Sequence, residues 1–221
     1  MRPLLLDALA WISLIVACAC AALILVDVLR RPQKMGIMNW VWPVTALYGG
    51  PLAVWAYLKL GRPDARGAPE TPPKLFWQSV VVSASHCGAG CTLGDIIAEI
   101  IVAAFALQIA GSMLGAEFAL DFAFAYVLGI AFQYFAIVPM RGLSFWPGIW
   151  AAVKADTFSL IAFEIGLFGW MALTYYVLFT PRLMPSEPAY WFMMQIGMLI
   201  GFATSYPMNV LLIRWGVKEP M

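Results

Sequence analysis

Apolar side chains run through most of this chain in long stretches, which short polar segments separate. A helix needs about 20 predominantly apolar residues to cross the hydrocarbon core of a bilayer. The pattern predicts six such helices, at residues 4–28, 37–58, 91–113, 118–140, 156–179 and 190–213. The predicted fold is therefore all-α, a polytopic membrane bundle of about six transmembrane helices.

The apolar stretch 75–113 is too long for one crossing, because as a single helix it would measure about 58 Å. Its glycines offer a place for the helix to break: Gly88, Gly90 and Gly94. We therefore expect residues 75–85 to form a half-helix, either re-entrant or lying at the interface, before the third full span. One longer helix is the alternative.

Two polar stretches and a pair of glycines predict where the chain forms linkers, loops and bends. Residues 59–74 are rich in proline and basic residues, so they predict a linker. It divides the chain into an N-terminal two-helix segment (1–60), a polar linker (61–74) and a four-helix core domain (75–221). Residues 141–155 predict a loop that contains a short interfacial helix, because Trp146 and Trp150 suit the headgroup region. Asp156 is the predicted N-cap of the fifth span. Gly49 and Gly50 predict a bend in the second.

Composition narrows the class of protein. The 221 residues are 63% hydrophobic and 11% charged, with a mean hydropathy of +0.84. Soluble domains average about 25% charged residues, so the natural partner of this surface is a lipid bilayer. A net charge of +1 argues against a nucleic-acid partner.

The basic residues predict an orientation. With six crossings, most of them fall on the side that both termini share. Because cytoplasmic loops carry an excess of Lys and Arg, we expect both termini in the cytoplasm. The expected location is the bacterial inner membrane.

Candidate chemistry concentrates in residues 85–99, which contain the single histidine of the chain. Cys91, Asp95 and Glu99 follow one another at four-residue steps, and this spacing lays them along one helix face. His86 and Cys87 come just before them. Thiolate and imidazole suit soft or borderline ions, so His86, Cys87 and Cys91 predict a site for Cu(I) or Zn(II). Three ligands are one short of a closed zinc site.

Buried acids suggest a cavity next to these ligands. Glu99 and Glu164 each lie nine residues into a predicted span, at a depth of about 13 Å. Ionisable groups at such depth usually face the bundle interior and have a function. We expect one polar cavity, with His86, Cys87 and Cys91 at its mouth. Its predicted lining is Asp95, Glu99, Gln133, Glu164, Tyr206 and Asn209.

Several of these residues also carry a family resemblance. The segments 85–99, 154–160, 206–209 and 214–221 resemble a family of bacterial integral membrane proteins whose shared domain has no known function (DUF4396). The resemblance covers about residues 75–221, and the first two spans look like an addition to it. It implies an association with copper-related modules, which favours copper as the metal.

Three functions stay open from the sequence. The leading hypothesis is a membrane protein that binds or transports a soft transition metal, copper first. The second is a membrane thiol–disulfide oxidoreductase that uses Cys87 and Cys91, the less favoured because the spacing strains a disulfide. The third is a proton-coupled carrier of a small solute. A carrier of this size often needs a second copy, so a homo-oligomer is also expected.

Overall fold

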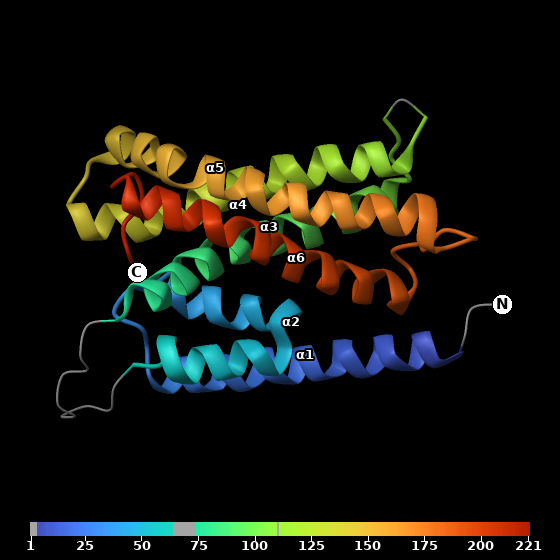
Figure 1. The fold of residues 1–221 in the computed structure, drawn as a ribbon, viewed down its shortest axis with the longest axis horizontal. Coiled ribbons are helices and arrows are strands. Elements are labelled where there is room, and N and C mark those ends of the chain that lie inside the picture. The colour runs from blue at the N-terminus through green and yellow to red at the C-terminus, as the bar shows by residue number, and fades with distance from the viewer. Residues whose placement is uncertain (1–3, 64–73, 110) are drawn as a thin grey trace.

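The structure is a computed structural model, and it describes residues 4–63, 74–109 and 111–221. Its helices are α1 (Leu4–Arg30), α2 (Met38–Ala56), α3 (Phe76–Phe105), α4 (Met113–Arg141), α5 (Phe145–Leu173) and α6 (Pro188–Arg214). The π-helical turns η1 (Tyr57–Gly61) and η2 (Thr174–Leu178) continue α2 and α5. In this part of the chain five helices, all except α2, are long and apolar enough to cross a membrane. The predicted all-α polytopic bundle is confirmed (Figure 1).

Helix α2 is a re-entrant hairpin rather than the predicted second crossing. At Gly50 the backbone takes φ 50° and ψ −131°, and there the helix doubles back (Figure 1). Beyond that point the Tyr57 ring packs on the Trp42 ring, with centroids 5.7 Å apart. Gln33 contacts both ends of the hairpin, at the Asn39 side chain and at the Gly61 carbonyl. The hairpin therefore enters and leaves on the same side of the bundle.

Helix α3 is continuous from Phe76 to Phe105, so the predicted break at its glycines was wrong. The absence of side chains at these glycines instead lets helix α4 pack closely against α3. A Cβ on Gly94 would clash with the Ala125 backbone nitrogen, and one on Gly90 would lie 2.7 Å from the Gly129 Cα. Small residues allow this close approach of helices in membranes.

Helix α5 begins earlier than predicted, since the segment expected as a loop with a separate interfacial helix forms the first turns of α5 from Phe145. Asp156 therefore lies inside the helix, and its predicted N-cap role was wrong. Most of the predicted linker, residues 64–73, lies outside the described residues.

Five crossings put the two ends of the described chain at opposite ends of the bundle (Figure 1). Ser13, early in α1, donates a hydrogen bond of 2.7 Å to Gln195, early in α6, so these helices begin on the same side. The chain after α6 lies at the other end. The arrangement does not fit the prediction that both termini share one side, because that prediction counted α2 as a crossing.

Candidate functional site

Helix α3 carries a ladder of ionisable groups through the centre of the bundle. Cys87, Cys91, Asp95 and Glu99 follow at four-residue steps, and each is at most 1% exposed. The spacing predicted a shared face, and in the structure that face is covered by the other helices. The sulfur of Cys91 lies near the Asp95 and Glu164 carboxyls, with which it interacts electrostatically.

Three acids from other helices lie around Asp95 and Glu99 of this ladder. Glu117 and Asp121 come from the first turns of α4, and Glu164 comes from the middle of α5. Asp95 interacts electrostatically with Glu164 and Asp121. Glu99 interacts with Glu117. Five carboxyl groups from three helices thus form one buried chain: Asp95, Glu99, Glu117, Asp121 and Glu164.

No cation balances this carboxyl chain among the described residues. The ion pairs given by the structure lie elsewhere, between Arg62 and Asp27, Arg141 and Glu219, and Lys218 and Asp156. Both carboxyl oxygens of Asp95 are buried without a hydrogen-bond partner in the part of the chain that the structure describes. An unpaired buried carboxylate costs several kcal/mol, so five of them close together need a physical explanation.

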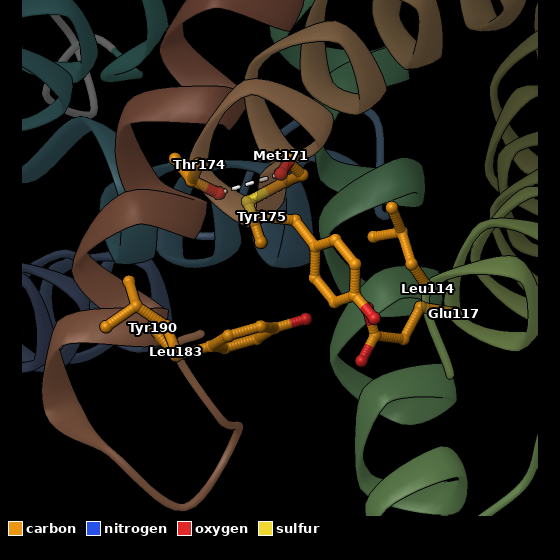
Figure 2. Close-up of a pocket in the computed structure, with 7 residues that line it drawn as sticks. All are labelled: Leu114, Glu117, Met171, Thr174, Tyr175, Leu183 and Tyr190. Carbon is orange, nitrogen blue, oxygen red and sulfur yellow. Dashed lines mark hydrogen bonds between the residues drawn. The ribbon is translucent and has the colours of Figure 1, made fainter. Parts of the chain in front are cut away.

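The carboxyl chain ends at a small pocket between α4, the end of α5 with η2, and α6 (Figure 2). Its lining is Leu114, Glu117, Met171, Thr174, Tyr175, Leu183 and Tyr190. The Tyr190 side chain is buried, and its hydroxyl interacts with the carboxyls of Glu99 and Glu117. This pocket is the opening of the carboxyl chain toward the end of the bundle where α6 begins.

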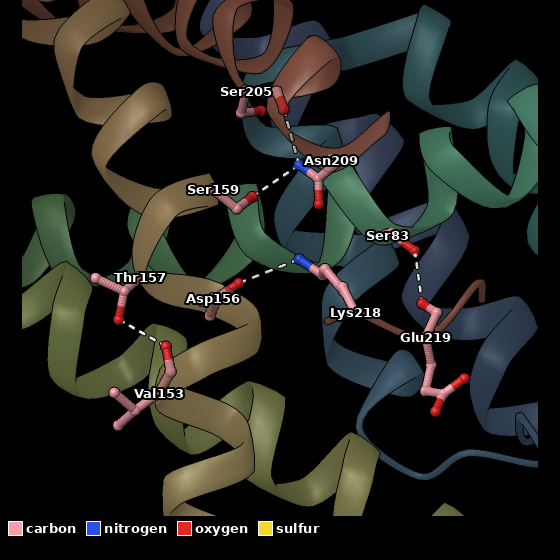
Figure 3. Close-up of polar contacts among 9 residues, drawn as sticks. All are labelled: Ser83, Val153, Asp156, Thr157, Ser159, Ser205, Asn209, Lys218 and Glu219. Carbon is pink, nitrogen blue, oxygen red and sulfur yellow. Dashed lines mark hydrogen bonds and ion pairs between the residues drawn. The ribbon is translucent and has the colours of Figure 1, made fainter. Parts of the chain in front are cut away.

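A second polar layer lies toward the opposite end (Figure 3). Lys218, from the segment after α6, turns inward and its Nζ lies 3.2 Å from Oδ1 of Asp156, both side chains being at most 1% exposed. Nearby, the Asn209 amide donates hydrogen bonds of 2.7 Å to the Ser159 hydroxyl and 2.9 Å to the Ser205 carbonyl. Asp156 lies about 12 Å from Glu164 along α5, so the layers are separate.

The predicted metal ligands do not converge. The His86 ring packs against Phe132, with centroids 6.0 Å apart, and interacts with Lys218. Cys87 and Cys91 belong to the core around Phe163 instead. Adjacent positions on a helix point about 100° apart, which separates His86 from Cys87. Among the described residues no three His, Cys, Asp or Glu side chains are arranged to hold a metal ion.

The remaining residues of the predicted cavity do not lie in the carboxyl chain. Gln133 is buried, but it lies about 18 Å along α4 from Asp121, and both its amide atoms lack a partner. Asn209 belongs to the layer of Lys218. Tyr206 is only half-buried and has no place in either layer. The structure brings together Asp95, Glu99 and Glu164 from the predicted set.

Sequence reasoning missed Glu117, Asp121, Tyr190 and Lys218. The predicted fourth span began at residue 118, which put Glu117 outside it and Asp121 in its first turn. Their four-residue spacing was the available signal, since it matches that of Asp95 and Glu99. Lys218 gave no signal, because nothing local predicts that a lysine after the last helix folds inward.

The sequence profile of a family described as a domain of unknown function, DUF4396, matches residues 76–218. The chain belongs to this family. The matched region comprises α3 to α6 and most of the tail after them, while α1 and α2 lie outside it. No curated protein and no solved structure is significantly similar to the chain.

Proposed function

We propose that this protein is a proton-coupled carrier of a small solute, in which the buried carboxyl chain binds and passes protons. One observation carries the proposal: five acids from three helices lie together in the membrane-spanning core, and no ion pair among the described residues includes any of them. Buried carboxyls are costly, and in membrane proteins they often form proton relays.

The order of the acids along the bundle fits a relay. Glu117 lines the pocket, Glu99 and Asp121 come next, and Asp95 and Glu164 lie deepest. Neighbouring members interact electrostatically, so a proton leaving one group changes the proton affinity of the next. Such coupling is what a stepwise transfer requires.

The re-entrant hairpin α2 supports carriage rather than a purely structural role. Its Tyr48 reaches the centre of the bundle, where its hydroxyl lies 2.8 Å from the position that a Cβ on Gly88 would take. The same hydroxyl interacts with Cys87 and Cys91. Transporters place interrupted helices of this kind at their binding sites near the midplane.

The basic residues support an orientation with Met221 in the cytoplasm. In the described chain only Arg182 lies at the end where α6 begins. The others lie at or toward the opposite end: Arg30, Arg31, Lys34, Lys59, Arg62, Lys74, Arg141, Lys154, Arg214 and Lys218. By the positive-inside rule that end faces the cytoplasm, so the pocket opens on the other side. The bacterial inner membrane is part of the same proposal.

Copper or zinc binding at His86, Cys87 and Cys91 stays an untested prediction, and the directions of these side chains favour it less than proton coupling. The thiol oxidoreductase is disfavoured by access, because both thiols are fully buried. Metal analysis of the purified protein checks the first alternative. Unchanged copper binding in a Cys87→Ser, Cys91→Ser double variant would end it.

Charge movement on a pH jump tests the proposal. The full chain is reconstituted in vesicles on a solid-supported membrane, and acidification is expected to give a transient current as the carboxyl chain takes up protons. Glu164→Gln should reduce that current at least tenfold, since it removes a deep proton acceptor without changing the side-chain volume.

The matched control is Glu219→Gln, which removes a carboxyl that is half-buried in the tail and pairs with Arg141. It should leave the current unchanged. Equal currents from the parent chain and from Glu164→Gln would refute the relay.

A further inference from the structure

The segment after α6, residues 215–221, folds back onto the end of the bundle opposite the pocket. At Gly216 the backbone has φ 68° and the chain reverses its direction. The backbone nitrogens of Val217 and Lys218 then donate to the Leu212 carbonyl at 3.0 and 3.2 Å. The reversal brings the segment back to the helices instead of leading it away from them.

Contacts with three other helices hold this segment in place (Figure 3). Lys218 pairs with Asp156 of α5 at 3.2 Å, and both side chains are buried. The Glu219 side chain pairs with Arg141 at the end of α4, and the Glu219 carbonyl accepts a hydrogen bond of 3.4 Å from Ser83 of α3. All these contacts are made by side chains or by one long hydrogen bond, so no helix has to unfold for the segment to move away.

Polar groups without partners lie beneath this segment. Gly90 of α3 packs on Gly129 of α4, and the two helices run in opposite directions. One helical turn further, His86 therefore lies opposite Gln133. Both side chains are fully buried, and none of their side-chain nitrogen or oxygen atoms has a hydrogen-bond partner among the described residues. His86 also interacts electrostatically with Lys218.

Two oxygens of the Asp156 layer are in the same condition. Oδ2 of Asp156 and Oδ1 of Asn209 are buried without a hydrogen-bond partner in the described chain. The Asp156 oxygen lies 2.9 Å from the position that a Cβ on Gly129 would take, which puts it one turn from Gln133. Buried polar atoms without partners destabilise the arrangement that buries them, because water would bond to them. The ion pair thus favours the closed segment, and the atoms beneath it oppose closure.

We propose that residues 215–221 form a latch, which closes the end of the bundle opposite the pocket and opens by withdrawal of Lys218 from Asp156. The latch rests on the carrier function proposed above, because a carrier has to open to each side of the membrane in turn. Gly216 is its hinge. Opening lets water reach the layer and supplies the partners that its polar atoms lack.

Acylation of the Lys218 amine tests the latch, since this amine can react only outside the layer. Purified full-length protein in detergent is pulsed with sulfosuccinimidyl acetate, and the modified peptides are quantified by mass spectrometry. The exposed Lys154 is the internal reference. The fully buried Cys91 thiol, followed in parallel with N-ethylmaleimide, reports global unfolding. Lys218 should react more slowly than Lys154 but well before Cys91.

Two variants should change the Lys218 rate in opposite directions. Gln133→Leu replaces an amide that lacks partners with an apolar side chain of similar size, so it should slow acylation at least threefold. Gly216→Ala puts a side chain at a positive φ where a Cβ meets nothing within 4 Å, so it strains only the closed turn and should speed acylation about threefold. Gln108→Leu makes the matched substitution at an exposed position and should equal the parent chain.

Two results would overturn the latch. One is equal reaction of Lys218 and Cys91, which would mean that only global unfolding exposes the amine. The other is a rate in Gln133→Leu that equals or exceeds that of the parent chain. The relay is tested separately, because Glu164→Gln should keep the parent rate of Lys218 acylation while it loses the pH-jump current. That pair of results supports both proposals, and a current without local acylation of Lys218 leaves only the relay.

Discussion

Near the end of the bundle that carries Lys218, a buried carboxyl faces a buried ammonium, while toward the other end five carboxyls face one another. The Asp156 layer has its charges matched and its amide bonded to a hydroxyl and a carbonyl. The carboxyl chain has no cation among the described residues. Buried oxygens without a hydrogen-bond partner occur in both regions, at Asp95 in the carboxyl chain and at Asp156 and Asn209 in the layer. Both are equally buried, so burial alone does not distinguish a structural polar layer from a functional one. Whether the charges are balanced does.

The largest expected effect is on the balanced layer. Lys218→Met leaves Asp156 buried without its partner, and breaking a buried ion pair from one side costs about 3–5 kcal/mol. The thermal unfolding midpoint in detergent should fall accordingly. Glu219→Gln breaks only the half-exposed pair with Arg141, and should cost about 1 kcal/mol or less. Equal losses in the two variants would mean that the Lys218 pair is not buried as described.

A middle-sized effect is expected where the carboxyl chain is held by close packing. Gly94→Ala puts a Cβ against the Ala125 backbone, which cannot move aside as a flexible side chain can. Overpacking of this kind costs about 1–3 kcal/mol in unfolding free energy. Gly169→Ala is the control, since a Cβ there meets nothing within 4 Å. A stable Gly94→Ala variant would contradict the close approach of α3 and α4.

The smallest expected effect, that of Asp95→Asn, compares the carboxyl chain most directly with the Asp156 layer. Asp95→Asn removes a carboxyl that has neither a hydrogen-bond partner nor a cation among the described residues. The unfolding free energy should therefore change by less than about 1 kcal/mol. Asp156→Asn, the same substitution in the other layer, should lose more because Lys218 keeps its charge. Unfolding in detergent compares the two directly. A large loss in Asp95→Asn alone would reveal an ionised Asp95 with a partner.

Part of the site followed from local spacing. Four-residue steps place Cys91, Asp95 and Glu99 on one face whatever surrounds the helix, and long apolar runs require burial in lipid. Glu117 and Asp121 had the same spacing, and a helix start a few residues too late concealed them. The structure does not add support to the copper hypothesis. That hypothesis grouped His86 with Cys87 because they are adjacent in the sequence, whereas adjacent side chains on a helix point in different directions.

The sequence by itself determined the all-α membrane class, five of the crossings and the buried acid face of α3, because hydrophobic length and helical period are local properties. Tertiary structure alone decided that Gly50 reverses α2, that Gly90 and Gly94 receive α4 instead of breaking α3, and that Lys218 folds back to Asp156. The physical reason is that a glycine permits a turn and a close contact equally well. Only the neighbouring helix selects between them.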